Sequence, residues 1–400
     1  TSPLPDHQPL ASKGRVSKVA GFALLGQVYL TMATTLDAAN RTANLNAAKT
    51  NLTSAYTKRT FGALKEIPYA DVFDVAKKST NPEIIFQIVN KQGDINYSSG
   101  IAASNQAQGE TINSQRTNTG VGGNVTPDLV KEYEETDLRK AFSIKFANAA
   151  TVKDYFITKY RDASAAAGTN GYGGNDWILI RYADVMLMLA EVNLYLGDEA
   201  SAVSFLDQVR ERAGMPKYEV ARTNATYSSQ FPTLKLAILH ERRVELAFEN
   251  HRWFDLLRFF TPTELVTYIR AKSQADFGVA KLSNFGTKDY YYPIPFDENK
   301  LKVLLIRSDL KQYEGQWSLL GDLVKSDEGL DEAAYRILKQ RTGLNDVFLE
   351  QVHTFGEVDR HPASRVVTVA YCSLINIQHH KLKICGLTHQ ISHGCFGSRV

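Results

Sequence analysis

Residues 177–214 read WILIRYADVMLMLAEVNLYLGDEASAVSFLDQVRERAG, and residues 234–259 read LKLAILHERRVELAFENHRWFDLLRF. Apolar residues recur at helical spacing between positions 182 and 196, which predicts a helix with little polar surface. Gly197 predicts the end of that helix, and Asp198 is placed to cap the next one. The first stretch therefore predicts two antiparallel helices joined by a very short turn.

Small residues lie where these two helices are expected to approach each other. Ala183 and Ala190 border the apolar stripe of the first helix, and small side chains allow close helix packing. Such a hairpin is the building block of tetratricopeptide-type arrays. Helical spacing in residues 14–32 and again in 36–56 predicts a second hairpin of the same plan. We therefore predict a mainly α fold of tetratricopeptide-like helical hairpins.

Short β-prone segments and polar loops connect the helices. EIIFQIV at 83–89 is apolar and β-branched, as in a strand, and residues 126–146 indicate mixed helix and strand. Two segments rich in Gly and Asn, 91–126 and 165–176, predict irregular loops, and long loops in compact domains often carry function. Three loop side chains are candidates for stacking on a sugar or hydrogen bonding to it: Tyr97, Arg116 and Tyr172.

Composition limits the possible partners. A length of 400 residues favours two domains or one large one. The net charge is +3, and Lys and Arg are scattered among acidic residues, so we expect no nucleic-acid partner. Residues 1–300 contain no cysteine, whereas Cys372, Cys385 and Cys395 follow at irregular spacing. Those three cysteines form neither a disulfide framework nor a CxxC metal motif, and they do not indicate in which cellular compartment the protein lies.

A row of acidic residues in the second quoted stretch has two interpretations. Glu241, Glu245 and Glu249 are four residues apart, so on one continuous helix they share a face and could form a metal site or an acid–base pair. Arg242 lies three residues before Glu245, and Arg252 lies three after Glu249 and three before Asp255. Ion pairs are favoured, because a carboxylate metal site needs more oxygen ligands than one helix can direct to it.

Neighbouring residues receive the same structural interpretation. Trp253 and Phe254 are expected in the hydrophobic core rather than as platforms for a sugar. Arg181, Asp184 and Glu191 lie on the narrow polar side of the first helix, where we expect them to form ion pairs. No catalytic residue, metal ligand or cofactor site is predicted in this part of the chain.

Four motifs in order resemble the SusD/RagB family of nutrient-uptake proteins of the Bacteroidetes outer membrane. They are IRYADVMLMLAEVNLYLGD, LDQVRERAG, HERRVELAFENHRWFDLLRF and YYYPIP, and the resemblance covers about residues 10–295. It implies a surface-exposed lipoprotein that captures a glycan or another nutrient without catalysis. It also implies that the protein acts with a TonB-dependent outer membrane transporter as its partner.

The beginning of the chain departs from that family pattern. Residues 1–15 read TSPLPDHQPLASKGR and contain neither the apolar core of a signal peptide nor a cysteine for lipid attachment. We therefore expect residues 1–295 to be an N-terminally truncated SusD/RagB-like helical binding domain.

Residues 296–376 resemble the Nudix fold, particularly Nudix-related sugar-responsive regulators, as an incomplete α/β domain. Glu328, Arg336 and Gly343 match positions of the Nudix signature, and Asp322 replaces its first glycine. In that family the glutamates of the signature helix hold magnesium against a diphosphate. Ile337, Gln340 and Arg341 occupy the positions of those glutamates here, which argues against metal-dependent hydrolysis.

Residues 377–400 show no clear pattern and are left unassigned. Their histidines and cysteines could be drawn as a zinc site, but the irregular spacing argues against one. The leading hypothesis for the whole chain is therefore non-catalytic nutrient capture. The alternatives are a fragment of a cytoplasmic sugar-sensing regulator and a Nudix hydrolase.

Overall fold

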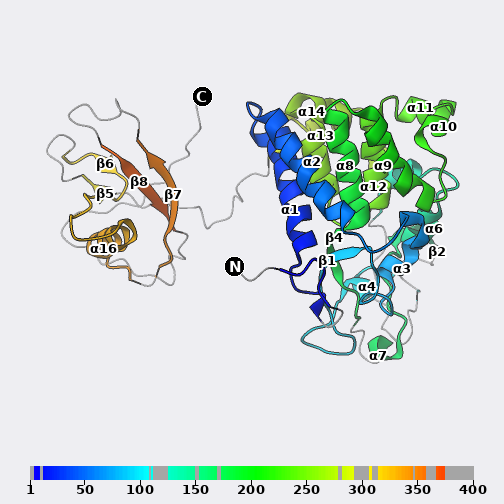
Figure 1. Cartoon of the computed structure of the whole chain (residues 1–400), viewed down its shortest axis with the longest axis horizontal. Helices are drawn as coiled ribbons and strands as arrows, with labels where there is room; N and C mark the ends of the chain where they lie inside the picture. The colour runs from blue at the N-terminus through cyan, green and yellow to red at the C-terminus, as the bar shows by residue number, and fades with distance from the viewer. Residues whose placement is uncertain are drawn as a thin grey trace. The chain divides into compact units, whose positions relative to one another are not determined.

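A computed structural model describes the chain as two compact units, Thr1–Tyr292 and Pro293–Val400. It describes residues 4–9, 12–107, 110, 125–148, 153–168, 173–277, 282–291, 306–308, 314–345, 347–356 and 366–373. Figure 1 shows the helices and strands of both units.

The first unit is mainly helical (Figure 1). Its α-helices are α1 Lys18–Thr31, α2 Arg41–Thr57, α3 Tyr69–Phe73, α4 Ile101–Ser104, α5 Pro127–Glu132, α6 Leu138–Ser143, α7 Ala165–Gly168, α8 Tyr182–Tyr195, α9 Glu199–Arg212, α10 Tyr218–Ala221, α11 Ala225–Gln230, α12 Leu234–Glu245, α13 Arg252–Phe259, α14 Pro262–Arg270 and α15 Gln274–Phe277. Its strands are β1 Ile84–Ile88, β2 Ile144–Asn148, β3 Lys153–Ile157 and β4 Trp177–Arg181. The predicted mainly α fold is confirmed.

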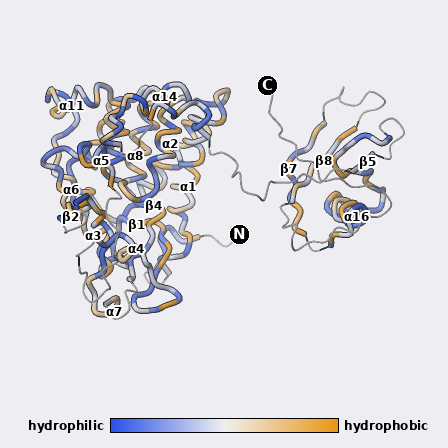
Figure 2. The backbone as a smooth tube through the Cα atoms, turned by 180° about the vertical axis from the view of Figure 1, so that it is seen from behind, coloured by the Kyte–Doolittle hydropathy of each residue, from blue (hydrophilic) through white to orange (hydrophobic). Residues whose placement is uncertain are grey.

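Both predicted helical hairpins are present. Helices α8 and α9 pack together, Gly197 takes a left-handed φ of 80°, and the Asp198 side chain accepts a hydrogen bond from the Ser201 amide to cap α9. Helices α1 and α2 form the other hairpin, and α2 also packs against α8. The backbones of α1 and α2 approach closely at Gly26, where an added Cβ would lie 2.5 Å from Leu52 Cγ. Apolar residues recur along α1, α2 and α8 (Figure 2), and the buried ones belong to two core clusters that both include residues of α8.

Helix α1 and the π-helical turn that follows it together span Lys18–Leu36. Judged by length and composition alone, this segment is apolar enough to cross a membrane. Val19, Ala23 and Leu30 are buried in the same cluster as the inner faces of α2 and α8. This packing accounts for the buried apolar residues of the segment, whereas Leu24, Leu25, Val28 and Leu36 are exposed.

The residues before α8 differ from the prediction. Trp177–Arg181 forms strand β4, which pairs antiparallel with β1, so α8 begins directly from a strand and not from a loop. The predicted strand at 83–89 is confirmed as β1. Residues 126–146 contain α5, α6 and the start of β2, as expected. The β1–β4 pair is important because it fixes where the two polar loops leave the helical array.

The second quoted stretch is not one continuous helix. Helix α12 ends at Glu245, and the turn that follows contains Phe248 and Asn250, both with φ near 65°. Such left-handed backbone is unusual for residues other than glycine and interrupts the helix before α13 begins. Glu249 therefore lies in this turn, so the expectation that three glutamates share one helix face is wrong.

The expectation for the two adjacent aromatic residues was half right. Trp253 is partly buried and packs against the main core cluster, with its ring edge-on to Phe285. Phe254, in contrast, is 52% exposed. Helix α13 is amphipathic, so of these two consecutive residues one faces the core and the other faces solvent.

In the part of the second unit that the structure describes, there are one helix and two strand pairs. Its described elements are β5 Ile306–Arg307, β6 Trp317–Ser318, α16 Leu330–Thr342, β7 Glu350–Phe355 and β8 Thr368–Cys372. Strand β5 pairs with β6, and β7 pairs with β8, both antiparallel. This small α/β arrangement agrees with the prediction of a C-terminal α/β domain.

Candidate functional site

The polar centre of the first unit is built around Glu245, the last residue of α12. Its carboxylate accepts from Arg181 Nη1 at 2.6 Å and from Arg139 Nη1 at 2.9 Å, and it also pairs with Arg212. These arginines come from the end of β4, from α6 and from α9, and all four side chains are buried. Glu83, before β1, pairs with Arg181 and Arg212 and extends the cluster.

The other two glutamates of the row continue this network. Glu241 pairs with Arg139 at 2.6 Å and with Arg210 at 3.0 Å. Glu249 pairs with Lys159 at 2.6 Å and with Arg181 at 2.7 Å. Burial alone would raise the pKa of Glu249, but the charges of Arg181 and Lys159 lower it to about 2. Glu249 is therefore an ionised scaffold group, and the prediction that the glutamates of the row form ion pairs is confirmed.

The predicted partners of those ion pairs were wrong. Arg242 binds Asp255 and Asp184, each at 2.9 Å, and not Glu245. Arg252 donates to the Leu239 carbonyl and the Tyr268 hydroxyl, so it pairs with neither acidic neighbour. Arg242 pairs with residues of α8 and α13, because it is buried in α12 where this helix packs against those two helices.

Three further charged residues also behave as expected. Arg181 lies in the cluster around Glu245, Asp184 pairs with Arg242, and Glu191 pairs with Arg258 at 3.0 Å. Among the residues that the structure describes, no group of three or more His, Cys, Asp or Glu side chains has the geometry of a metal site. The charged centre of this unit is thus a buried network of paired charges.

The two polar loops predicted to contact a ligand come together at their roots. Ser99 and Gly173 form an antiparallel bridge, with N–O distances of 2.7 and 3.2 Å in the two directions. Gln92 also spans the loops, since its amide donates to the Asp162 carboxylate at 3.1 Å. The sequence indicated both loops but not that they would meet.

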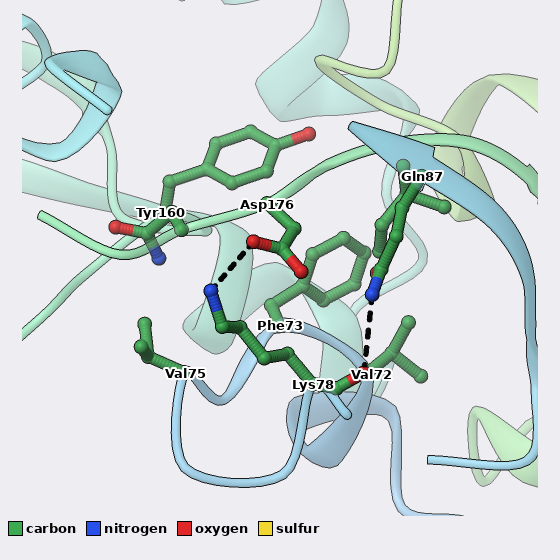
Figure 3. A pocket seen from close by; sticks show the side chains of 9 residues that line it. Val72, Phe73, Val75, Lys78, Gln87, Tyr160 and Asp176 are labelled. Carbon is green, nitrogen blue, oxygen red and sulfur yellow. Dashed lines mark hydrogen bonds and ion pairs between the residues drawn. The ribbon is translucent and has the colours of Figure 1, made fainter. Parts of the chain in front are cut away.

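Lys78, in the turn between α3 and β1, binds the same loop roots (Figure 3). Lys78 Nζ donates to Asp176 Oδ1 at 2.6 Å, to the Gly174 carbonyl at 2.8 Å and to the Asn90 carbonyl. The Asn90 amide donates to the same Asp176 oxygen at 2.8 Å. Burial raises the pKa of Asp176, while the bond to Lys78 acts in the opposite direction. No motif indicated Lys78 or Asp176, because their pairing joins positions almost a hundred residues apart.

The three candidate sugar-contacting residues have different outcomes. Tyr97 is 67% exposed on the first loop, and its backbone carbonyl accepts from the Lys91 amide, which closes a turn between them. Arg116 and Tyr172 lie outside the described residues. The described part of the site is thus an exposed tyrosine beside a junction of two loops, and its role in ligand contact remains a prediction.

In the second unit, the retained signature residues form a local ion pair. Arg336, on α16, makes two hydrogen bonds to Glu328, one of 2.7 Å from Nε and one of 2.5 Å from Nη2. The bond from Arg336 lowers the pKa of Glu328 to about 2. Helix α16 ends at Gly343, which takes a left-handed φ of 77°. The one acid kept from the signature is thus neutralised by arginine.

Two family matches divide the chain in the same order as its two units. Residues 141–315 match the SusD family, and residues 293–383 match the NUDIX domain. The solved "Surface glycan-binding protein A from Bacteroides thetaiotaomicron" has a TM-score of 0.52 and 16% identity, covering 69% of this chain and 60% of that one. That similarity is one of fold.

The curated relatives are of two kinds. "SusD-like protein P2" of Formosa agariphila is 26% identical over 320 residues, which is 74% of this chain and 59% of the relative. "ADPR responsive transcriptional repressor NtrR" of Acinetobacter baylyi is 31% identical over 115 residues, covering 26% of this chain and 46% of that protein. This chain thus spans less than two thirds of the length of either relative.

The fold and its paired charges define a helical-hairpin scaffold that presents irregular loops. The helical unit is similar to the SusD family, and a segment similar to the NUDIX domain follows it.

Proposed function

We propose that this protein binds a glycan or another nutrient at the cell surface, without catalysis, and delivers it to a TonB-dependent transporter of the outer membrane. The SusD family domain carries the proposal. A solved protein of the same fold is described as a surface glycan-binding protein, which favours an oligosaccharide as the ligand.

The loop junction supplies the contact surface in this proposal. The Ser99–Gly173 bridge and the Lys78 hydrogen bonds hold two polar loops against the buried scaffold, and Tyr97 extends from one of them into solvent. An exposed tyrosine offers an apolar face for stacking on a sugar ring and a hydroxyl for hydrogen bonding. A ligand bound there needs no rearrangement of the charged core.

Glycan binding by the full chain is the first test. An array of plant, algal and animal oligosaccharides identifies a ligand, and titration calorimetry then compares the wild type with Tyr97→Ala. We expect the substitution to weaken binding about tenfold, equivalent to about 1.4 kcal/mol. Tyr291→Ala is the matched control, because Tyr291 is 68% exposed and lies outside both loops.

The outcomes separate the general proposal from the choice of residue. No binding by the full chain to any oligosaccharide on the array contradicts glycan capture. Equal affinities of Tyr97→Ala, Tyr291→Ala and the wild type would instead remove Tyr97 from the site. Co-purification with a TonB-dependent transporter from a Bacteroidetes outer membrane tests the partner separately.

A second candidate function concerns the NUDIX unit. Its relative is named as an ADPR-responsive repressor, and Arg336 neutralises the retained Glu328, while Ile337, Gln340 and Arg341 replace the metal-holding acids. We infer that this unit, if it acts independently, senses a sugar nucleotide without hydrolysing it. This is the activity expected of a cytoplasmic regulator.

The test is a titration of the full chain with ADP-ribose, followed by an assay for phosphate-ester products in the presence of Mg²⁺. Binding without product formation supports sensing. Metal-dependent hydrolysis that Glu328→Gln abolishes would contradict it and establish a hydrolase. Confinement of the chain to the cytoplasm in cell fractions would favour this candidate over nutrient capture.

A further inference from the structure

A small cavity lies beside the junction of the two polar loops (Figure 3). It offers about 10 Å³ to the centre of a water-sized guest. Phe73 and Ile178 form part of its apolar wall, and Gln87, Asn175 and Asp176 supply polar groups. A volume of this size is about that needed by one water molecule.

Three residues that line the cavity each have a buried oxygen that accepts no hydrogen bond from the residues that the structure describes. These oxygens are Gln87 Oε1, Asn175 Oδ1 and Asp176 Oδ2, and the exposed fractions of their residues are 2%, 3% and 7%. Hydrogen bonds from the amide nitrogens fix the orientation of the Gln87 and Asn175 side chains. Gln87 Nε2 donates to the Lys78 carbonyl, and Asn175 Nδ2 donates to the Arg161 carbonyl. Buried oxygens of this kind destabilise a fold unless a donor reaches them.

The nearest cation has no donor to spare. Lys78 carries three N–H donors, and these are used by the Asn90 carbonyl, the Gly174 carbonyl and Asp176 Oδ1. The missing donors must therefore come from a guest in the cavity. The guest must be small and must donate more than one hydrogen bond.

The charge balance favours a neutral guest over a metal ion. The Lys78 ammonium group already compensates the Asp176 carboxylate at 2.6 Å. A cation added beside this pair would leave an unbalanced charge in a largely buried place, which is strongly unfavourable. A water molecule adds no charge and supplies two donors to the three oxygens.

We propose that this cavity binds one water molecule, and that the water, Lys78 and Asp176 together fix the roots of the two polar loops. Gln87 belongs to β1, and Asn175 and Asp176 directly precede β4, so the water bridges the ends of the two paired strands. The loops leave from these ends. The proposal concerns the unliganded protein and does not depend on glycan binding.

A high-resolution crystal structure of the full chain provides the first test. We expect one density peak in the cavity, at about 2.7–3.0 Å from at least two of the three oxygens. A peak with oxygens at about 2.3–2.6 Å, together with an unfolding temperature that falls in excess EDTA, would identify a metal ion such as Ca²⁺ and overturn the proposal. An empty cavity would also overturn it.

Hydrogen exchange of two variants tests the effect on the loops. Gln87→Leu removes one of the three oxygens together with the Gln87 Nε2 hydrogen bond to the Lys78 carbonyl, and Gln230→Leu makes the same substitution at an exposed position on α11. We expect the Asn90 and Gly174 amides to exchange on the order of tenfold faster in Gln87→Leu only. Unchanged exchange in Gln87→Leu would contradict the positioning role, and if that variant fails to fold, the wild-type crystal structure still decides the proposal.

Discussion

Helices α12 and α16 both carry acidic and basic side chains, but burial gives these charges different roles. Nine of the 12 residues of α12 are buried, including Glu241, Arg242 and Glu245. Only Ala333 and Thr342 are buried among the 13 residues of α16. Each ionised group of α12 that leaves water must therefore find a partner, whereas the charges of α16 keep much of their hydration.

The two helices also differ in where their partners lie. Glu245 binds arginines from three other elements, so its carboxylate joins α12 to α6, β4 and α9. Arg336 of α16 binds Glu328, eight residues earlier in the chain. The ion pairs of Glu245 therefore hold distant elements of the tertiary structure together, while the Arg336–Glu328 pair orders a local turn. The following experiments test this distinction.

The largest effect is expected for Glu245→Gln. The substitution nearly keeps the side-chain volume but leaves three buried arginines without their shared carboxylate. We expect the free energy of unfolding of the first unit to fall by about 3–5 kcal/mol, measured by urea denaturation. Glu219→Gln, at an exposed position, is the control and should change little. A loss below about 1 kcal/mol would show that the buried network contributes no more than surface pairs.

Acid should weaken the first unit through the same network. The pKa of Glu249 is about 2 in the folded protein against an ordinary value of 4.5, so its ion pairs stabilise the fold above pH 4.5. This contribution is lost as pH falls from 4.5 toward 2, because the unfolded chain takes up the proton first. Urea midpoints measured across that range should decline, and Glu249→Gln should decline less steeply. Parallel curves for the two proteins would contradict this role.

Packing without charge is tested by two glycines of α1. An added Cβ at Gly26 would lie 2.5 Å from Leu52 Cγ and 3.2 Å from the Leu52 amide nitrogen, whereas at Gly21 it meets nothing within 4 Å. Gly26→Ala should destabilise the unit by about 1–3 kcal/mol through overpacking. Gly21→Ala should stabilise it by about 0.5–1 kcal/mol, because alanine favours the helix. Thermal unfolding of the two variants should therefore shift in opposite directions.

The smallest effect is expected for Glu328→Gln. Glu328 is partly buried, but its pair with Arg336 is local, and Arg336 keeps hydrogen bonds to Gln340 and to the Leu323 carbonyl when the charge of Glu328 is removed. Hydrogen exchange along α16 should change only near its first turn. Loss of protection throughout α16 would show that this pair holds the unit together as Glu245 holds the first one.

The sequence by itself was sufficient to predict both helical hairpins, the turn at Gly197 and the cap at Asp198. Helical periodicity and capping are local properties, so they can be read from neighbouring residues. The sequence also predicted that the glutamates of the row form ion pairs, although the nearby Arg242 and Arg252 are not their partners. The resemblance to SusD and Nudix proteins also followed from motif order alone.

Only the tertiary structure decided which charges pair and where the loops meet. Glu245 is paired with Arg139, although their positions are 106 residues apart, and Lys78 is paired with Asp176 across 98. The break after Glu245 and the exposure of Phe254 depend on how α12 and α13 pack against the rest of the array. Local sequence determines which segments are helical, but burial and partner choice are set by contacts between segments that are distant in the chain.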